Sequence, residues 1–246
     1  MDLLIKSAVM MAFLGIACLA VVWSLLRGFK PRSVILIGTL TLWLVMAAIF
    51  LLTESALGKD TLPLLHQYFT DTWAHQSQWL KESGFSQDKI DIFKDIFERY
   101  IFQAFPAWLA VNSLLLALVA YYLCSSLLAR VTRKVTRPIS FQNWVVPEPL
   151  VFGLIAGGLL KVVPLLSNGP WDILGSNLLV FFIGLYTLSG LSIVSFFFHK
   201  WRLPPALRIL SYLLLLNLVF ETICCFGVLD VWFDFRKLKR TTPELT

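Results

Sequence analysis

The stretch DILGSNLLVFFIGLYTLSGLSIVSFFF, residues 172–198, decides the class of this protein. Asp172, at its first position, is the only charged residue that it contains. A helix needs about 20 predominantly apolar residues to cross the hydrocarbon core of a bilayer, which is about 30 Å thick. The stretch exceeds that length, so it predicts a helix that crosses a membrane.

Five other apolar runs approach or exceed the same length. They lie at residues 8–26, 34–52, 101–129, 149–166 and 205–229. Hydrophobic residues make up 58% of the chain and charged residues 15%, which is more apolar surface than one soluble core can bury. We therefore predict an all-α fold, a polytopic transmembrane helix bundle of about six spans.

Basic residues collect in the turns between these runs. Residues 27–32 carry three bases and no acid, residues 130–137 carry four bases and no acid, and residues 199–202 are also basic. Cytoplasmic loops of membrane proteins carry an excess of Lys and Arg. The three turns are therefore predicted to lie in the cytoplasm, and the protein to be a multi-pass protein of the bacterial cytoplasmic (inner) membrane.

The C-terminal end conflicts with this arrangement. Six crossings would place four basic residues on the outer face, against the charge rule: Arg236, Lys237, Lys239 and Arg240. Either the rule fails there or one segment does not cross. The weakest candidate is the run at 149–166, which is short and contains Lys161 and Pro164. The side of the C-terminus stays open.

Residues 59–100 form the only long polar segment of the chain. Apolar side chains recur in it at helical spacing, in two sets: Leu65, Tyr68, Phe69, Trp73 and Leu80, and then Ile92, Phe93, Ile96, Phe97, Tyr100 and Ile101. Gly84 is a suitable stop for the first helix and Ser86 a suitable cap for the second. We predict an external amphipathic helical hairpin, which either rests on the outer membrane interface or forms a lid over a cavity.

Ionisable and amide side chains inside apolar runs are the candidates for a site. A charged residue at the centre of a span costs about 2.5–3.5 kcal/mol, so each one needs a partner, water or a function. The candidate intramembrane polar site comprises Glu221, Lys161, Asn112, Asn177 and Asn217. Similar depths permit an ion pair between Lys161 and Glu221. The alternative is that Lys161 extends to the surface while Glu221 is protonated or bonded to Asn217.

The chain lacks the motifs of common catalytic and cofactor sites. The four cysteines, at 18, 124, 224 and 225, fall within apolar runs and do not have the spacing of a zinc site. Gly153, Gly157 and Gly158 lie in an apolar helix and are predicted to allow close helix packing. We predict no catalytic, cofactor-binding or metal-binding residue, no enzyme activity, and no nucleic-acid partner, because the basic residues adjoin apolar runs.

Several strings in the second half of the chain resemble the YybS-like family of predicted bacterial membrane proteins, a domain of unknown function (2232). They are residues 105–107 with Asn112, residues 141–153 (FQNWVVPEPLVFG), residues 175–178 (GSNL), residues 186–193 (YTLSGLSI) and residues 227–237 (GVLDVWFDFRK). The resemblance implies a membrane domain at 101–240 with about four spans. Two N-terminal spans at 1–58, the external segment at 59–100 and a tail at 241–246 complete the predicted organisation.

Two functions remain in competition. In the first, the protein binds a small solute or lipid between its helices, for example as the membrane subunit of a transporter, and Glu221, Lys161, Asn112 and Asn177 converge on one cavity. In the second, it is a non-transporting scaffold or assembly protein whose polar groups hold helices together. The expected partners are the lipid bilayer and, in either case, other membrane subunits.

Overall fold

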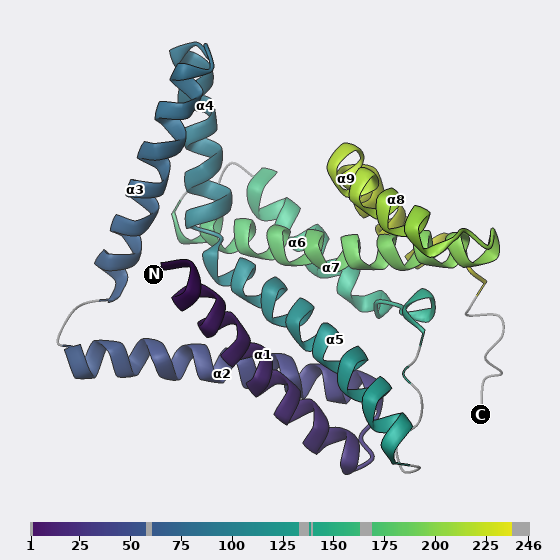
Figure 1. Cartoon of the computed structure of the whole chain (residues 1–246). Helices are drawn as coiled ribbons and strands as arrows, with labels where there is room; N and C mark the ends of the chain where they lie inside the picture. Colours follow the sequence, from purple (N-terminus) through teal and green to yellow (C-terminus); the bar gives the residue numbers. More distant parts are fainter. Residues whose placement is uncertain (1, 58–60, 133–137, 139, 163–168, 238–246) are drawn as a thin grey trace. The chain divides into compact units, whose positions relative to one another are not determined.

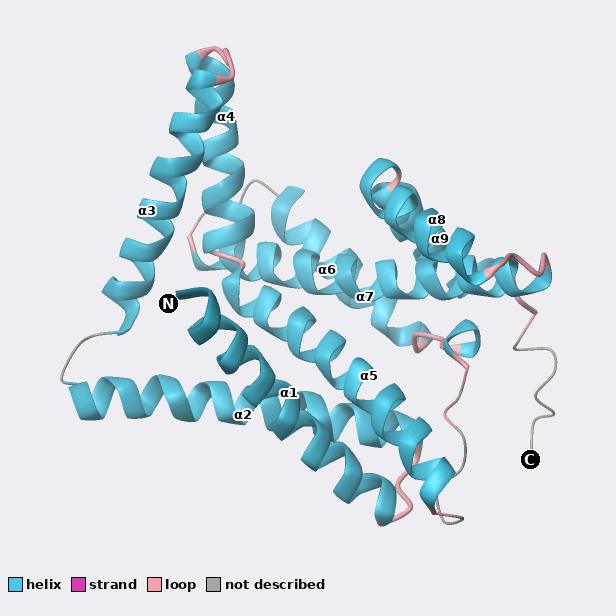
Figure 2. Cartoon of the chain, viewed as in Figure 1, coloured by secondary structure: helices cyan, strands magenta, loops and turns pink. Residues whose placement is uncertain are grey.

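A computed structural model describes residues 2–57, 61–132, 138, 140–162 and 169–237. Every regular element among them is helical, which confirms the all-α class (Figures 1 and 2). The chain divides into two compact units, Met1–Pro138 and Ile139–Thr246, each described by itself. The basic connector at 133–137 and the tail at 241–246 lie outside the described residues. The predicted domain boundaries stay predictions; the structural division falls at Pro138.

Three apolar helices form the body of the first unit: α1 (Asp2–Leu26), α2 (Pro31–Leu57) and α5 (Phe105–Val131). They pack against one another around small residues. A Cβ on Gly38 of α2 would lie 3.2 Å from the Cβ of Ala117 on α5 and 3.3 Å from Cγ2 of Val21 on α1. Close approach of three helices at small residues is the usual way membrane helices gain contact, since burial from lipid gives little driving force.

The polar segment of the first unit folds as two consecutive helices, α3 (Thr61–Glu82) and α4 (Gln87–Phe97). Gly84 has a φ of +82° in the turn that joins them, and Ser86 occupies the N-cap position of α4 without a side-chain cap hydrogen bond. Both helices, and the turn that separates them, agree with the sequence pattern. The external position of the pair stays a prediction.

A π-helical turn, η1 (Glu98–Phe102), separates α4 from α5. The sequence pattern suggested that the second amphipathic helix continues into the third span from residue 101; instead α5 begins at Phe105, with Pro106 in its first turn. The indole Nε1 of Trp108 donates a hydrogen bond to the carbonyl oxygen of Tyr100 at 2.8 Å. This bond satisfies a carbonyl of the irregular turn, where regular helical bonding is interrupted.

The second unit is organised around one long helix, α7 (Pro170–Lys200). Before it come two short 3-10 turns, η2 (Phe141–Asn143) and η3 (Glu148–Leu150), and the helix α6 (Val151–Val162). Helices α6 and α7 lie side by side (Figure 1). A Cβ on Gly157 would lie 3.0 Å from Cβ of Leu178, so the glycine permits this close approach, as its position in the sequence predicts.

The last apolar run is two helices rather than one. Helices α8 (Pro205–Leu218) and α9 (Phe220–Phe233) meet at Val219 with a bend of 98°. The span expected at 205–229 is therefore interrupted, and its crossing of the membrane as one span is not confirmed. Helix α9 packs on α7 through two glycines, because a Cβ on Gly190 would overlap the carbonyl oxygen of Ile223, and one on Gly227 would overlap that of Tyr186.

Three described helices are long and apolar enough to cross a membrane: Pro31–Ile49 within α2, Phe105–Val131 and Pro170–Lys200. The bent α8–α9 pair would make a fourth if it counts as one span. Helix α6 has 12 residues and is about 18 Å long at 1.5 Å per residue, short of the 30 Å core. The protein is membrane-embedded, but the prediction of six spans is not confirmed.

Candidate functional site

Lys161, at the end of α6, forms an ion pair with Asp172 in the first turn of α7. Its Nζ donates to Oδ1 of Asp172 at 2.7 Å, and the two side chains are 13% and 14% exposed. The sequence permitted a pair with Glu221; the ion pair that Lys161 forms in the structure is with Asp172. Helices α6 and α7 are adjacent and joined by a short connection, so the acid nearest to Lys161 is the first one on the next helix.

Glu221 lies in the first turn of α9, and its side chain is exposed. Among the described residues it has no ion-pair partner. Asn217 precedes the bend at Val219, so the two residues belong to different helices, and the Nδ2 of Asn217 donates to the carbonyl oxygen of Leu213 at 2.8 Å. The bond between Asn217 and Glu221, which was one of the alternatives, is not among the hydrogen bonds of these described residues. An acid in a first helical turn is favoured by the helix dipole, which accounts for Glu221 locally.

The other two asparagines also bond within their own helices. Asn112 donates to the carbonyl oxygen of Trp108 at 2.8 Å, and Asn177 donates to that of Ile173 at 2.9 Å. Such a bond to the residue four positions earlier gives an amide a partner without a second helix. Asn112 belongs to the first unit, and the other four candidates to the second. Convergence of the set on one cavity therefore stays a prediction.

The Lys161 ion pair gives a direct test. Replacing Lys161 or Asp172 by leucine should each destabilise the protein in detergent, because the remaining charge loses its partner. The double variant should recover part of the loss, with a coupling free energy on the order of 1 kcal/mol or more in a thermal-unfolding cycle. A matched cycle between Lys161 and Glu221 should be additive. Coupling in the second cycle and none in the first would contradict the observed pairing.

A second ion pair, which the sequence did not suggest, lies deeper in the same unit. The Nη2 of Arg236 donates to Oδ2 of Asp230 at 2.5 Å, and the arginine side chain is fully buried. Its Nη1 reaches the carbonyl oxygens of Gln142 at 3.0 Å and Trp144 at 2.9 Å, and also the hydroxyl of Ser192. One guanidinium thus links the end of α9, the η2 turn and the C-terminal third of α7.

This network gives hydrogen-bond partners to polar groups that lipid cannot satisfy. Residues 144–146, between η2 and η3, are not helical, and such backbone is tolerated at membrane depth only where protein covers it. Ser192 donates a further bond to the carbonyl oxygen of Trp144 at 2.9 Å. The backbone N–H of Phe235 donates to Oδ1 of Asp230 at 2.9 Å, after a left-handed Asp234 (φ 43°) turns the chain back.

This network was not predicted, because Arg236 stands beside Lys237 in a basic terminal cluster, where it resembles a loop charge. A signal was nevertheless present. Gln142 and Trp144, Ser192, and the pair Asp230 and Arg236 belong to three of the strings that carry the family resemblance. The structure brings these three strings together in the second unit.

Two grooves lie between α3 and the segment formed by α4 and η1, each with a volume of about 270 Å³. Both are bordered by Trp73 of α3 and Phe97 of α4, whose rings are 5.3 Å apart between centroids. The polar groove is also lined by His66, Phe69, Thr70, Lys94, Glu98 and Phe102. The apolar groove is also lined by Gln76, Trp79, Leu80, Phe93, Ile96 and Ile101.

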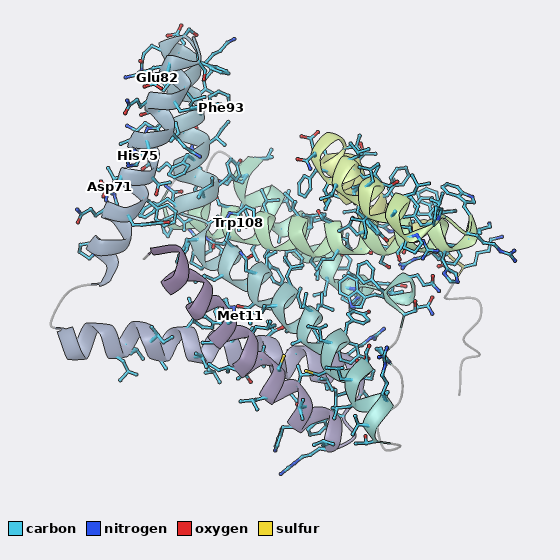
Figure 3. The ribbon with its side chains drawn as sticks, in the orientation of Figure 1. Met11, Asp71, His75, Glu82, Phe93 and Trp108 are labelled. Atoms are coloured by element: carbon cyan, nitrogen blue, oxygen red, sulfur yellow. The ribbon has the colours of Figure 1, made fainter. Side chains whose placement is uncertain are left out.

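The two helices carry exposed aromatic and charged side chains together. Tyr68 and Trp79 of α3 are 62% and 63% exposed, and Ile92 of α4 is 60% exposed. Figure 3 shows Asp71, His75 and Glu82 along α3, with Phe93 on α4; all three polar residues are exposed. A helix pair with apolar rings and charges at its surface suits the boundary between a membrane and water.

No group of three or more metal-ligating side chains occurs among the described residues. Long apolar helices, glycine-mediated crossings and polar groups bonded inside the protein define a polytopic helical membrane protein. Within that class the family is clear, since residues 2–231 match the family model described as predicted membrane protein (DUF2232). The chain belongs to this family, and its YybS-like resemblance is consistent with it. No curated protein and no solved structure matches the chain.

Proposed function

We propose that this protein is a non-enzymatic, multi-pass protein of the bacterial cytoplasmic membrane that binds a lipid or another small amphipathic solute. The observation that carries the proposal is the pair of grooves between α3 and α4. The grooves share an aromatic wall and differ in polarity. That combination suits a ligand with a polar end and an apolar end, because apolar lining with a few polar groups is typical of small-molecule sites.

The polar groove supplies groups for a charged headgroup. Lys94 offers an ammonium, Glu98 a carboxylate, and Thr70 a hydroxyl that donates to the carbonyl oxygen of His66 at 2.9 Å. The apolar groove has Gln76 as its one polar side chain among the described lining residues, and it accepts hydrocarbon. A phospholipid of the surrounding bilayer has both parts and is present at high concentration.

The binding site can be tested by native mass spectrometry of the detergent-purified protein with a bound bacterial phospholipid. Replacing Trp73 by alanine removes the wall that both grooves share, and the loss of one aromatic contact, about 0.5–1.5 kcal/mol, should lower lipid occupancy up to roughly tenfold. Trp232→Ala is the matched control, because Trp232 is 61% exposed on α9 and should contact only bulk lipid. Equal occupancy in both variants would overturn the proposed site.

A specific observation favours a second function, a non-transporting scaffold. At the α7–α9 crossing, Gly190 and Gly227 bring backbone against backbone, and the Arg236 network fills the neighbouring space. Close-packed helices leave no route for a solute at that crossing. Purification in mild detergent distinguishes the two functions, since recovery of an ATPase pair supports transport and recovery of an envelope assembly complex supports a scaffold.

A further inference from the structure

We propose that the bent α8–α9 pair enters and leaves the membrane at the same end of α7, so that Lys200 and Lys237 lie on one membrane face. The pair is then a re-entrant element rather than a span. The inference concerns the second unit alone and does not depend on lipid binding.

The first step concerns the segment that precedes α7. It runs antiparallel to α7, since successive residues meet α7 in reverse order, in the pairs Trp144 with Ser192, Gly153 with Phe182, Gly157 with Leu178, and Lys161 with Asp172. Between Ser192 and Asp172, α7 rises by about 30 Å at 1.5 Å per residue, which is the thickness of the hydrocarbon core. Residues 144–161 therefore cross the membrane beside α7, partly as helix and partly as non-helical chain.

The second step concerns the end of α9. Arg236 bonds to Gln142, Trp144 and Ser192, all of which lie toward the Lys200 end of α7 rather than the Asp172 end. Ser192 is eight residues before Lys200, or about 12 Å along the helix. Helix α8 begins at Pro205, directly after that same end of α7. The chain from 205 to 236 thus starts and finishes near one end of α7.

Helix lengths agree with this path. Helices α8 and α9 have 14 residues each and are about 21 Å long, so neither alone covers the 30 Å core. Their 98° bend also prevents them from acting as one straight span. Non-helical backbone beside α9 is covered by protein, because Val146 is 3% exposed and lines a cavity of about 10 Å³ with Ser189 and Asp230.

This path removes the conflict over the C-terminus. With residues 144–161 and α7 as crossings and the α8–α9 pair as a re-entrant element, the basic residues at 199–202 and the bases Arg236 and Lys237 fall on one face, as the charge rule requires. The segment that fails to cross is then 205–229, whereas residues 144–161, which include most of the run that is weakest by sequence, do cross. That face is the cytoplasmic one.

Cysteine accessibility in intact cells tests the inference. Lys200→Cys, Lys237→Cys and Ser83→Cys are made singly in the full chain with its four native cysteines replaced by serine. A membrane-impermeant maleimide should label the Ser83→Cys variant in intact cells, and the Lys200→Cys and Lys237→Cys variants only after permeabilisation. Labelling of Lys200→Cys and Lys237→Cys from opposite faces would overturn the re-entrant path. Labelling of both variants in intact cells would still agree with the re-entrant path, but it would place that face outside the cell and overturn the cytoplasmic assignment.

Fusions to the protein that keeps its four native cysteines give a second measurement, which serves if the variant with four serines does not fold. A fluorescent protein attached after Lys237 should fluoresce, because it folds in the cytoplasm, and alkaline phosphatase at the same point should be inactive. An active phosphatase fusion together with a non-fluorescent fluorescent-protein fusion would place Lys237 on the outer face of the membrane. That result would contradict the proposal, given a cytoplasmic result for a fusion after Lys200.

Discussion

Replacing Arg236 by leucine is expected to destabilise the protein more than any other single change of a charged side chain described here. Asp230 would keep its charge in a buried position without a partner, and the carbonyl oxygens of Gln142 and Trp144 would lose a donor. Removing one partner of a buried ion pair typically costs about 3–5 kcal/mol. Thermal unfolding in detergent and the yield of monodisperse protein measure the loss.

The comparison variants separate the ion pair from the backbone contacts. Asp230→Leu should also destabilise, and the double variant should recover only part of the loss, because the two carbonyl oxygens stay without the guanidinium. Lys237→Ala is the matched control, since Lys237 is the neighbouring base and is exposed. Equal stability of the Arg236→Leu and Lys237→Ala variants would show that Arg236 is not buried in the membrane-embedded protein.

Adding one methyl group at the α7–α9 crossing is the second change expected to have a large effect. In Gly227→Ala the new Cβ would overlap the carbonyl oxygen of Tyr186 and would lie 2.8 Å from the backbone nitrogen of Gly190. The obstacle is backbone inside two helices, so it cannot rotate away as a side chain can. Forcing the helices apart should cost about 1–3 kcal/mol or more and should also separate Arg236 from Ser192.

The control for this prediction is Gly158→Ala on α6, where a Cβ would have no atom within 4 Å. Alanine favours a helix over glycine by about 1 kcal/mol, so this variant should be as stable as the original protein or slightly more stable. Thermal unfolding and size-exclusion profiles of the two variants are compared directly. If Gly227→Ala proved as harmless as Gly158→Ala, the close α7–α9 crossing would be refuted.

Both predictions test contacts of the second unit that hold the Arg236 network in place. Neither of them tests the α3–α4 grooves of the first unit. A variant that unfolds the second unit should therefore be distinguishable from one that removes ligand binding in the first. Trp73→Ala is expected to lower lipid occupancy with little change in the unfolding of the Arg236 region. The two sets of variants together separate a structural role for the second unit from a binding role for the first.

The sequence by itself determined the membrane class, the helical content and the two amphipathic helices. Each follows from local information, since apolar length sets whether a helix can cross a bilayer and helical spacing marks an amphipathic face. Gly84 and Ser86 marked the boundary between α3 and α4 for the same reason. Gly157 also packs closely against a second helix, as predicted, because small residues on an apolar helix permit close contact whatever the partner; Gly158, for which the same was predicted, has no such contact.

Only the tertiary structure decided which polar groups meet and which apolar run fails to stay straight. Lys161 pairs with Asp172 because α6 and α7 are adjacent, and Arg236 is buried where it pairs with Asp230 and donates to the carbonyl oxygens of Gln142 and Trp144. The bend at Val219 likewise has no local mark such as proline. Charge and hydropathy are properties of single residues, whereas a partner depends on the arrangement of helices around it, and that arrangement is set by contacts between segments distant in the chain.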